Sequence, residues 1–475
     1  MSRDLSSRIL SGTAIQTFAR VFAAASSFIV LLVLQRVLER EDFGLFNYYL
    51  TALTMAGAFV TFGATTVAVR EISQNEASTA SVISQVTRFE WISGAIAAVI
   101  LASITLLREE GLVRQILIVL ACTQLLSHAL CAPVVLFQAR LSFRLPALAL
   151  IAGSFLSLTA SMIAYGLGVR SFEPYLLFVC AGSFLQALLV WWNARPHLAS
   201  FDKTRDRKFW PFFREMFPIG LSSVAGSLYM YLDSLMIRDL VLEGGEEAVG
   251  DYNAAYKILS FALMVPVVFC QSLFPVFARN EKDDHAVFVR VVQRSFFYAM
   301  MLGVPLAVSL QWLAPLVIGG LWDEKAQASE GVLAILAWAV LLIFVSYPLI
   351  TALNAMGRQG DFMKIALGAI VVNATLNVVV IPRFGIEGAA WTTVVTEGFV
   401  FVSTLLRFMN LIGKSPFARD FWKVLVTGVV VGFVAFLLRG TSLTIAFPTM
   451  GFLTMGLWRL LGALPFDLFE DGKGR

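Results

Sequence analysis

Long blocks of apolar residues run along almost the whole chain, and short polar segments separate them. A helix needs about 20 mostly apolar residues to cross a bilayer. By this criterion the pattern predicts fourteen membrane-spanning helices, at residues 10–34, 43–68, 89–107, 114–138, 145–166, 174–193, 216–237, 250–277, 295–318, 330–355, 363–382, 386–408, 420–438 and 442–462. The polar connections between them are too short to hold a folded soluble domain.

The composition agrees with this pattern. The chain of 475 residues is 58% hydrophobic and 14% charged, with a mean hydropathy of +0.78, whereas a soluble protein carries about 25% charged residues. These values exclude a soluble enzyme, a nucleic-acid-binding module and a disordered chain. The apolar runs are continuous instead of alternating, which excludes a transmembrane β-barrel. We therefore predict an all-α polytopic membrane protein, whose backbone polar groups are satisfied within helices.

The cysteines and the N-terminus give no sign of a bound metal or a cleaved leader. Each of the four cysteines lies inside an apolar stretch, without a nearby Cys or His at metal-ligand spacing. We therefore expect no disulfide framework, no metal site and no cofactor. Ala23-Ala24-Ala25 after a basic start imitates a signal-peptide cleavage site. The apolar region continues to Leu34, however, and we interpret it as an uncleaved first helix.

Basic residues predict the orientation in the membrane. With the N-terminus in the cytoplasm, 25 of the 36 Lys and Arg residues fall on the cytoplasmic side, 9 fall on the opposite side, and Arg20 and Lys257 lie within spans. Lys and Arg accumulate on the cytoplasmic side of membrane proteins. Both termini should therefore be cytoplasmic. A missed span would have moved the later connections to the other side, so the bias also supports an even number of helices.

A weak internal repeat divides the helices into two groups. Gly44-Leu45-Phe46-Asn47 opens the second predicted helix and Gly250-Asp251-Tyr252-Asn253 opens the eighth, each after an acidic connection. A second set of matches at similar spacing pairs Pro133, Gln138-Ala139 and Gly168 with Pro348, Asn354-Ala355 and Gly385. A duplicated unit of six helices keeps its orientation. We therefore expect two six-helix lobes related by a pseudo-two-fold axis along the membrane normal, plus two C-terminal helices.

Four segments follow from the repeat. We expect an N-lobe at 1–193, a basic cytoplasmic linker at 194–215, a C-lobe at 216–410, and two further helices with a cytoplasmic tail at 411–475. In the linker, the basic residues of 203–208 precede the aromatic residues Phe209, Trp210, Phe212 and Phe213. This order is typical of a segment that lies on anionic lipid and not of a nucleic-acid site.

Several stretches of the sequence resemble one known family. Tyr231–Ile237 and Val249–Lys257 resemble the seventh and eighth helices of the Wzx-like O-antigen and exopolysaccharide flippases. Ile381–Trp391 resembles their turn between helices 11 and 12, and Leu38–Gly44 fits the same pattern. The resemblance covers essentially the whole chain, although no single motif is highly specific. This family belongs to the multidrug/oligosaccharidyl-lipid/polysaccharide exporter superfamily.

The resemblance implies a transporter of the bacterial inner membrane and not an enzyme. Such a flippase moves undecaprenyl-pyrophosphate-linked oligosaccharide outward, for surface polysaccharide or lipopolysaccharide synthesis, by ion-coupled alternating access between two six-helix lobes. Its implied partners are the lipid-linked oligosaccharide, membrane lipids, and a glycan polymerase with other assembly proteins, but no nucleic acid. The coupling ion would be H⁺ or Na⁺. Few charges lie in the spans, so the cationic cavity of the family would be sparsely furnished here.

Three other functions compete with this interpretation. A lipid II flippase of the same superfamily also has fourteen helices and a cationic cavity, and sequence separates it poorly. Multidrug exporters of the superfamily usually have twelve helices. A membrane glycan polymerase or ligase needs catalytic side chains on a sizeable external loop, and the external connections are short here. No Gly-x-x-x-x-Gly-Lys-[Ser/Thr] motif is present, so ATP does not drive transport directly.

Ionisable residues within spans are candidate functional groups, because a charge at membrane depth is costly. Arg20 lies in the first predicted helix with Gln16 one turn earlier, and Lys257 lies in the eighth with Asn253 one turn earlier. A cation from each lobe, facing one central cavity, would suit a pyrophosphate. Asn47 matches Asn253 in the repeat and completes this predicted substrate-binding set. The alternative is that both cations snorkel to the membrane surface.

Two acidic residues within spans are candidates for cation or proton coupling. Asp233 lies in the seventh predicted helix. It either binds the coupling ion or pairs with Lys257 on the adjacent helix. Glu397 lies in the middle of the twelfth, where it either carries a proton or makes a hydrogen bond between helices.

Other polar residues have simpler interpretations. Interhelical hydrogen bonding is expected of two pairs that share helix faces, Asn373 with Asn377 and Gln124 with His128. Four arginines at predicted cytoplasmic helix ends are either flanks that follow the positive-inside rule or a funnel through which the anionic lipid headgroup enters. They are Arg140, Arg144, Arg290 and Arg294.

Overall fold

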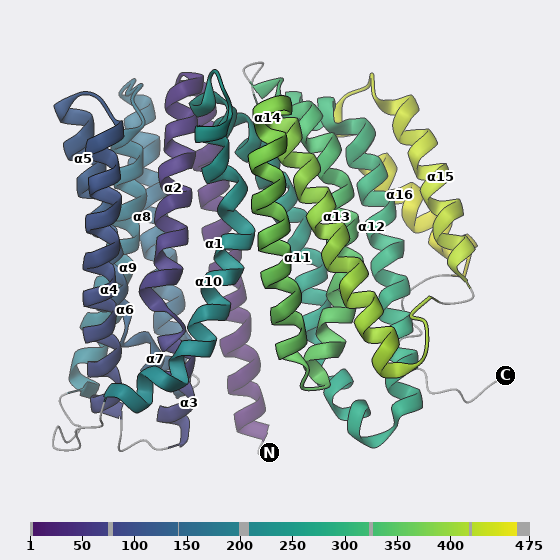
Figure 1. Cartoon of the computed structure of the whole chain (residues 1–475), viewed down its shortest axis with the longest axis horizontal. Coiled ribbons are helices and arrows are strands. Elements are labelled where there is room, and N and C mark those ends of the chain that lie inside the picture. Colours follow the sequence, from purple (N-terminus) through teal and green to yellow (C-terminus); the bar gives the residue numbers. More distant parts are fainter. Residues whose placement is uncertain are drawn as a thin grey trace. The chain divides into compact units, whose positions relative to one another are not determined.

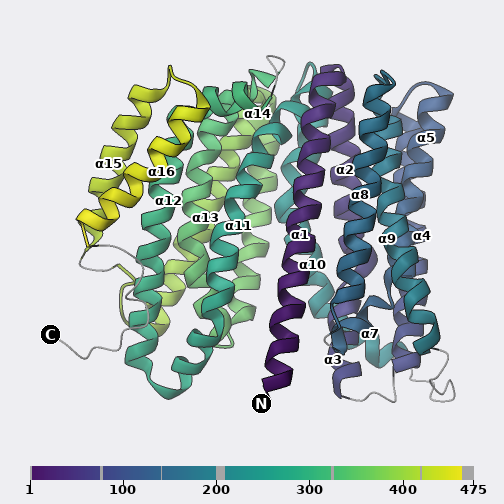
Figure 2. The same cartoon turned by 180° about the vertical axis from the view of Figure 1, so that it is seen from behind.

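The protein is described by a computed structural model, whose regular elements are all helices in the residues it describes (Figures 1 and 2). These residues are 3–74, 79–140, 142–198, 209–322, 326–417 and 420–462. Within them, 11 helices are long and apolar enough to cross a membrane. The prediction of an all-α polytopic membrane protein is confirmed.

The chain divides into two compact units, Met1–Tyr231 and Leu232–Arg475. Unit 1 contains α1 (Arg3–Val37), α2 (Arg40–Thr61), α3 (Ala64–Gln74), α4 (Thr79–Arg108), α5 (Leu112–Cys122), η2 (Thr123–Leu126), α6 (Ser127–Cys131), α7 (Val134–Ala139), α8 (Arg144–Gly166) and α9 (Glu173–Leu198). Unit 2 contains α11 (Gly245–Asp283), α12 (His285–Leu321), α13 (Ser329–Ala355), α14 (Gln359–Ile412), α15 (Phe421–Leu438) and α16 (Leu443–Leu460). The boundary falls inside α10 (Phe209–Leu240), so most of this helix belongs to unit 1. The sequence had instead placed residues from 216 onward in the C-lobe.

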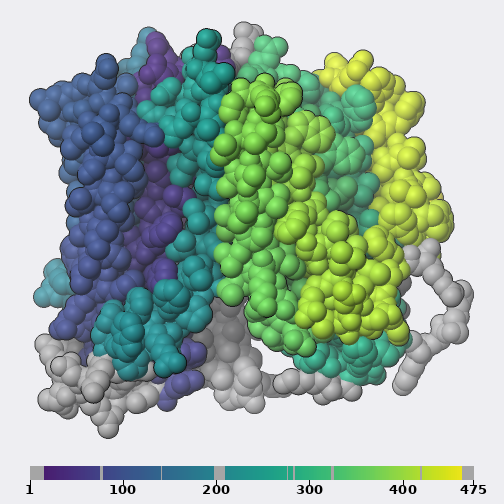
Figure 3. All heavy atoms as spheres, in the orientation of Figure 1, coloured from purple at the N-terminus to yellow at the C-terminus, as the bar shows by residue number. Residues whose placement is uncertain are grey.

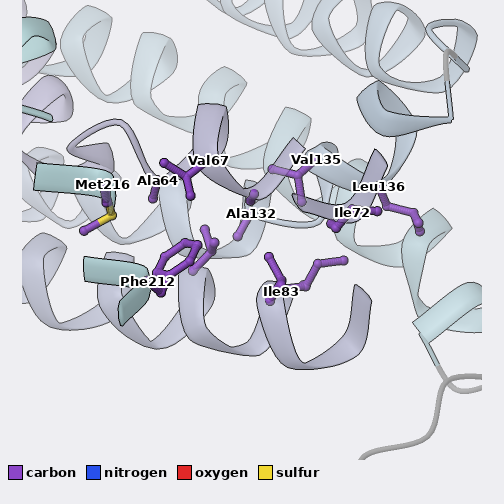
Figure 4. Packing of buried hydrophobic residues seen from close by; sticks show 12 residues of the cluster. Ala64, Val67, Ile72, Ile83, Ala132, Val135, Leu136, Phe212 and Met216 are labelled. Carbon is purple, nitrogen blue, oxygen red and sulfur yellow. The ribbon is translucent and has the colours of Figure 1, made fainter. Parts of the chain in front are cut away.

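Packing explains why the first part of α10 belongs to unit 1. Phe212 and Met216 are fully buried in a core that α3, α4 and α7 also build (Figure 4). The other members of this core are Ala64, Val67, Ala68, Ile72, Val82, Ile83, Val86, Ala132, Val135 and Leu136. The order of basic and aromatic residues predicted that this segment lies on lipid. Phe212 instead packs inside the core and does not face lipid. Lipid tails are as apolar as these side chains, so close packing holds this core together.

The second predicted span, 43–68, bends where it meets α10. Its first part is α2 and its second part is α3, and between them Phe62 and Gly63 take the left-handed conformation, with φ of 38° and 71°. A Cβ atom on Gly63 would lie 2.8 Å from the backbone nitrogen of Gly220 on α10. Position 63 therefore requires glycine for two reasons, its positive φ and the close approach of the two backbones.

The fourth predicted span, 114–138, is interrupted as well. It consists of α5, a short 3₁₀ segment η2, α6 and α7. Pro133 directly precedes α7. Because proline has no backbone N–H, it suits the start of a helix and breaks the interior of one.

In unit 2, one glycine divides the longest helix. Gly385 has φ 57° and ψ −140°, a conformation that is not helical, and it separates the two halves of α14. The halves correspond to the predicted spans 363–382 and 386–408. At the C-terminal end of the chain, Cβ atoms on Gly428 and Gly432 of α15 would lie 2.7 and 2.8 Å from valine side chains of α12. Small residues thus let α15 approach α12 closely.

All fourteen predicted spans fall on helical segments once α14 is counted as two, with α10 and α16 carrying the seventh and the fourteenth. The repeat motif also has the same local structure in both units. The side-chain amide of Asn47 donates to the carbonyl of Phe43 (2.8 Å), and that of Asn253 donates to the carbonyl of Val249 (2.9 Å). The symmetry axis between the lobes remains a prediction.

Candidate ion-coupling site

A buried carboxylate marks the strongest candidate site, and it lies wholly within unit 2. Asp233 belongs to the last turns of α10 and is only 7% exposed. Removing a carboxylate from water costs several kcal/mol unless charges or hydrogen-bond donors compensate it. The partners of Asp233 therefore show what the protein has arranged around this charge.

Three neutral donors from two other helices surround the carboxylate. Asn377 Nδ2 donates to Asp233 Oδ1 at 2.6 Å. Thr393 Oγ1 and the Tyr252 hydroxyl both donate to Asp233 Oδ2, at 2.7 and 3.1 Å. Hydrogen bonds to an ionised acceptor are roughly twice as strong as those between neutral groups. The site can therefore hold Asp233 as an anion without a cationic side chain.

The break at Gly385 makes this arrangement possible. Asn377 and Thr393 are both in α14, and 16 residues along an unbroken helix would separate them by about 24 Å. Both nevertheless contact the same carboxylate. The two halves of α14 must therefore fold back on each other at Gly385, and each half contributes one donor to the site.

Further oxygen atoms extend the site beyond the carboxylate. Asn377 Nδ2 also donates to Asn373 Oδ1 at 3.1 Å, and the Thr393 hydroxyl lies 3.1 Å from the Ala389 carbonyl oxygen. Asn377 Oδ1 is buried and has no hydrogen-bond partner. An unmet buried acceptor is unusual, because it costs about 1–3 kcal/mol. It is the kind of atom that a bound cation would satisfy.

The oxygen atoms of the site suit a small hard cation or a proton. The side-chain groups are a carboxylate, amides and hydroxyls, and hard cations prefer such oxygen ligands. No cluster of three His, Cys, Asp or Glu residues occurs within the described residues, so they offer nothing typical of a transition-metal centre. A proton on Asp233 would turn one oxygen into a donor, and the hydroxyls of Tyr252 and Thr393 can rotate to accept from it.

Of the two alternatives for Asp233, pairing with Lys257 is not seen, and coupling to an ion stays a prediction. The carboxylate forms no ion pair with Lys257; its hydrogen bonds go to the three neutral groups. The expected interhelical bonding of Asn377 is present, since its partner Asp233 lies on α10. Glu397 is also buried, at 6% exposure, one turn after Thr393 on α14, and it is not among the partners of Asp233.

The predicted substrate-binding residues are spread over both units. Arg20 is exposed on α1 of unit 1 and Gln16 is half-buried. Lys257 is half-buried on α11 of unit 2, one turn after Asn253, which accepts a 3.2 Å hydrogen bond from Ser234. Asn47 is buried. The convergence of Arg20 and Lys257 on one substrate stays a prediction.

The surface arginines and the linker add little evidence about the site. The four arginines proposed to flank the helices or to admit substrate are all exposed; they are Arg140, Arg144, Arg290 and Arg294. The basic residues of 203–208 lie outside the described residues. Sequence reasoning missed Tyr252 and Thr393 as site residues. Tyr252 stood in the repeat motif beside Asn253, which was the one signal that pointed to it.

The arrangement of helices matches solved transporter structures. The lipid II flippase MurJ, in an inward closed conformation, superposes with a TM-score of 0.74 over 96% of this chain and 98% of that protein, at 12% sequence identity. An inward-facing multidrug resistance transporter of the MATE family gives a TM-score of 0.65. At such low identity the likeness concerns the fold. The fold is therefore the one that these membrane transporters share.

More particularly, the family model described as "Polysaccharide biosynthesis protein" matches residues 9–281, more than half of the chain, and the protein belongs to this family. A second model, MatE, matches residues 218–379. Asp233 lies within both matched regions, while Asn377 lies within the second alone.

Curated relatives carry related names. A Haloferax volcanii protein named "Probable low-salt glycan biosynthesis flippase Agl15" is 23% identical over 45% of this chain and 46% of the relative. The capsular polysaccharide biosynthesis protein CapF of Staphylococcus aureus is 22% identical over 81% of this chain and 95% of the relative. The chain spans less than half the length of this Haloferax protein and of an uncharacterized membrane protein of Methanocaldococcus jannaschii.

Proposed function

We propose that the protein is a flippase that carries a lipid-linked oligosaccharide from the cytoplasmic to the outer leaflet for surface polysaccharide synthesis. The observation that carries this proposal is the match of residues 9–281 to the polysaccharide biosynthesis family. The name of the Haloferax relative, a glycan biosynthesis flippase, supports it. The carried lipid is undecaprenyl pyrophosphate, as the resemblance to Wzx-like flippases implies.

The proposal includes an orientation. The distribution of Lys and Arg, 25 against 9, supports a cytoplasmic position for both termini, and the resemblance to Wzx-like flippases supports the bacterial inner membrane. A reporter fused at residue 245 should then read periplasmic, and one at the C-terminus should read cytoplasmic. A periplasmic C-terminus would contradict the fourteen-helix topology.

Cations within the spans are the proposed contacts of the pyrophosphate. Arg20 and Lys257 would each donate charge-assisted hydrogen bonds to it, and Gln16, Asn47 and Asn253 would add neutral ones. A bond to a charged group is worth about 1.5–3 kcal/mol. Losing one cation should therefore weaken substrate binding by about ten- to a hundredfold.

A buried acidic site would couple transport to an ion. Asp233, with the oxygen atoms of Asn373, Asn377 and Thr393, is the proposed site for Na⁺ or H⁺. A coupling ion must bind one conformation of the transporter more tightly than the other in order to shift their populations. Glu397, one turn from Thr393, is the proposed second proton-carrying group.

The test is a deletion strain complemented with variants at matched membrane levels. We expect the deletion to accumulate lipid-linked oligosaccharide on the cytoplasmic face and the wild-type chain to clear it. Arg20→Gln and Lys257→Gln should each leave most of it uncleared, and Arg20→Lys should restore part of the activity because the charge remains. Arg170→Gln, an exposed arginine in a connection, is the matched control.

Three outcomes would overturn parts of this proposal. Accumulation of lipid II with normal surface glycan would reassign the substrate to the peptidoglycan precursor. Accumulation of neither lipid, with increased sensitivity to cationic drugs, would identify a multidrug exporter. Full complementation by both Gln variants would show that Arg20 and Lys257 snorkel and that other groups hold the pyrophosphate.

A further inference from the structure

A large groove on unit 1 lies apart from the residues proposed for transport. It has a volume of about 1160 Å³, and α4 lines most of it. One wall comes from the start of α10, because Phe89 of α4 packs against Phe209 and Phe213 with ring centroids 6.4 Å apart in each pair. Figure 3 shows the first turns of α10 in teal against the blue surface of the N-terminal helices. Another wall includes Trp191 of α9.

The lining of the groove changes from polar to apolar along α4. Ser81, Ser84 and Arg88 line its first turns, whereas Ile92 and Ile96 line its later turns. The distance along the helix from residue 81 to residue 96 is about 22 Å. One leaflet, including its headgroups, is about 20–22 Å thick. The groove therefore has the length and the polarity gradient of one lipid leaflet.

Two cations lie in or beside the groove: Arg88 lines it, and Arg195 contacts Trp191, which lines it. Arg88 is exposed and makes no ion pair or hydrogen bond with any residue in the described part of the chain. Arg195 of α9 stacks on Trp191 and Trp192, with its guanidinium carbon 4.6 and 5.5 Å from the ring centroids. Tryptophan prefers the headgroup level of a membrane. Arg88 in the groove and Arg195 beside Trp191 thus provide two cations for a phosphate group.

We propose that this groove binds one anionic membrane phospholipid. The phosphate lies at Arg88 and Arg195, and one acyl chain runs past Ile92 and Ile96 beneath the aromatic rings of α10. Charge complementarity selects an anionic headgroup, and basic residues near a membrane surface attract such lipids. The lipid is a resident ligand and not the transported glycan carrier. The inference rests on the membrane location of the chain and not on the identity of its substrate.

Binding should also stabilise unit 1. The groove joins α4 and α9 to the first turns of α10, whose residues Phe212 and Met216 complete the neighbouring core. A ligand that binds only the folded state raises its stability as its concentration exceeds the Kd. Anionic lipid should therefore raise the melting temperature of the purified protein more than zwitterionic lipid does.

The experiment titrates the full chain, purified in a neutral detergent, with dioleoylphosphatidylglycerol or dioleoylphosphatidylcholine. Native mass spectrometry counts bound lipid, and the melting temperature is measured in parallel. We expect the most tightly bound phosphatidylglycerol molecule to have a Kd at least about fivefold lower than that of phosphatidylcholine. Arg88→Gln should remove this preference for phosphatidylglycerol. Arg170 is an exposed arginine outside the groove, and Arg170→Gln should leave the preference unchanged.

Blocking variants test the acyl-chain half of the groove. Leu130→Trp places a large ring in the groove. Ile92→Trp places one at its exposed rim, and because Ile92 is 64% exposed, this change should leave the fold intact. Both should remove the tightly bound lipid. Leu106→Trp, also exposed but at the other end of α4, should keep it.

Several results would overturn the inference. Equal affinity for the two lipids, or equal effects of Arg88→Gln and Arg170→Gln, would show that the charge at the groove selects nothing. Unchanged lipid binding in Ile92→Trp would place the lipid elsewhere. Displacement of phosphatidylglycerol by an equal concentration of a polyprenyl phosphate would make the groove a substrate site instead. None of these outcomes depends on whether the protein transports a glycan.

Discussion

Asp233 of unit 2 and Glu90 of unit 1 are both almost fully buried carboxylates, at 7% and 2% exposure, but their surroundings differ. Asp233 accepts three hydrogen bonds from Tyr252, Asn377 and Thr393. Glu90, in α4, makes no hydrogen bond with any described residue, and its Oε2 is buried without a partner. Burial alone therefore does not distinguish these two carboxylates.

The difference lies in what the neighbours can offer to a charge. A carboxylate held by several hydroxyl and amide groups can exchange those donors for a cation or a proton without large movements. A carboxylate without hydrogen-bond donors around it has nothing to exchange, and a charge buried in this way is costly. The surroundings of Asp233 in unit 2 thus suit the proposed change of ionic state, whereas Glu90 in unit 1 has no donor among the described residues to exchange.

The largest effect is expected from Asp233→Asn. The amide keeps the size of the side chain but loses the charge, and its NH₂ group competes with the donors of Asn377 and Thr393. We expect glycan-lipid transport in proteoliposomes to fall by at least about a hundredfold, which corresponds to about 2.7 kcal/mol. The dependence of the melting temperature on Na⁺ or on pH should disappear as well.

Two outcomes would break the comparison at this point. If Asp233→Asn retained an ion-dependent melting temperature, the coupling site would lie elsewhere, with Glu397 as the next candidate. If Glu90→Gln removed the ion dependence instead, the roles of the two units would be reversed.

An intermediate effect is expected from Thr393→Val. Valine matches threonine in shape but cannot donate to Asp233 Oδ2, so the carboxylate loses a 2.7 Å hydrogen bond. We expect a loss of about 1–3 kcal/mol in the free energy of unfolding. Thr396→Val is the matched control, because the Thr396 hydroxyl is buried on the same helix without a hydrogen-bond partner. Equal destabilisation of both variants would show that the bond to Asp233 adds nothing.

The smallest effect is expected from Glu90→Gln. Glu90 has no hydrogen bond to any described residue to lose, and glutamine fills the same volume without bringing a charge into the interior. Stability in detergent should stay within about 1 kcal/mol of the wild type or rise slightly. A loss above that range, measured by the same unfolding assay, would reveal a partner of Glu90 that the comparison leaves out.

Much of the fold could be read from sequence because membrane spanning is a local property. Twenty apolar residues predict a helix wherever they occur. The extent of unit 1 could not be read in this way, because the boundary at Tyr231 falls inside the apolar run of α10. Only the contacts of Phe212 and Met216 with α3, α4 and α7 assign its first part to that unit.

The candidate site was partly visible in sequence. Asp233 stood out as an ionisable residue within a span, and Asn377 stood out as a polar residue on a shared helix face, but the sequence did not show that they meet. Thr393 is an ordinary residue for a transmembrane helix until the turn at Gly385 places it beside the carboxylate. Arg20 and Lys257 stood out for the same reason as Asp233, but among the described residues neither forms an ion pair or a side-chain hydrogen bond.

The sequence separations at the Asp233 site have a consequence for synthesis. The Asp233 partner Tyr252 follows it by 19 residues, whereas Asn377 and Thr393 follow it by 144 and 160. At about 5–20 residues per second, a ribosome takes roughly 7–30 seconds to reach Asn377. During that interval Tyr252 is the one of these three partners that has already been synthesised. The acid of α10 therefore lacks two of its three donors until the α14 hairpin emerges.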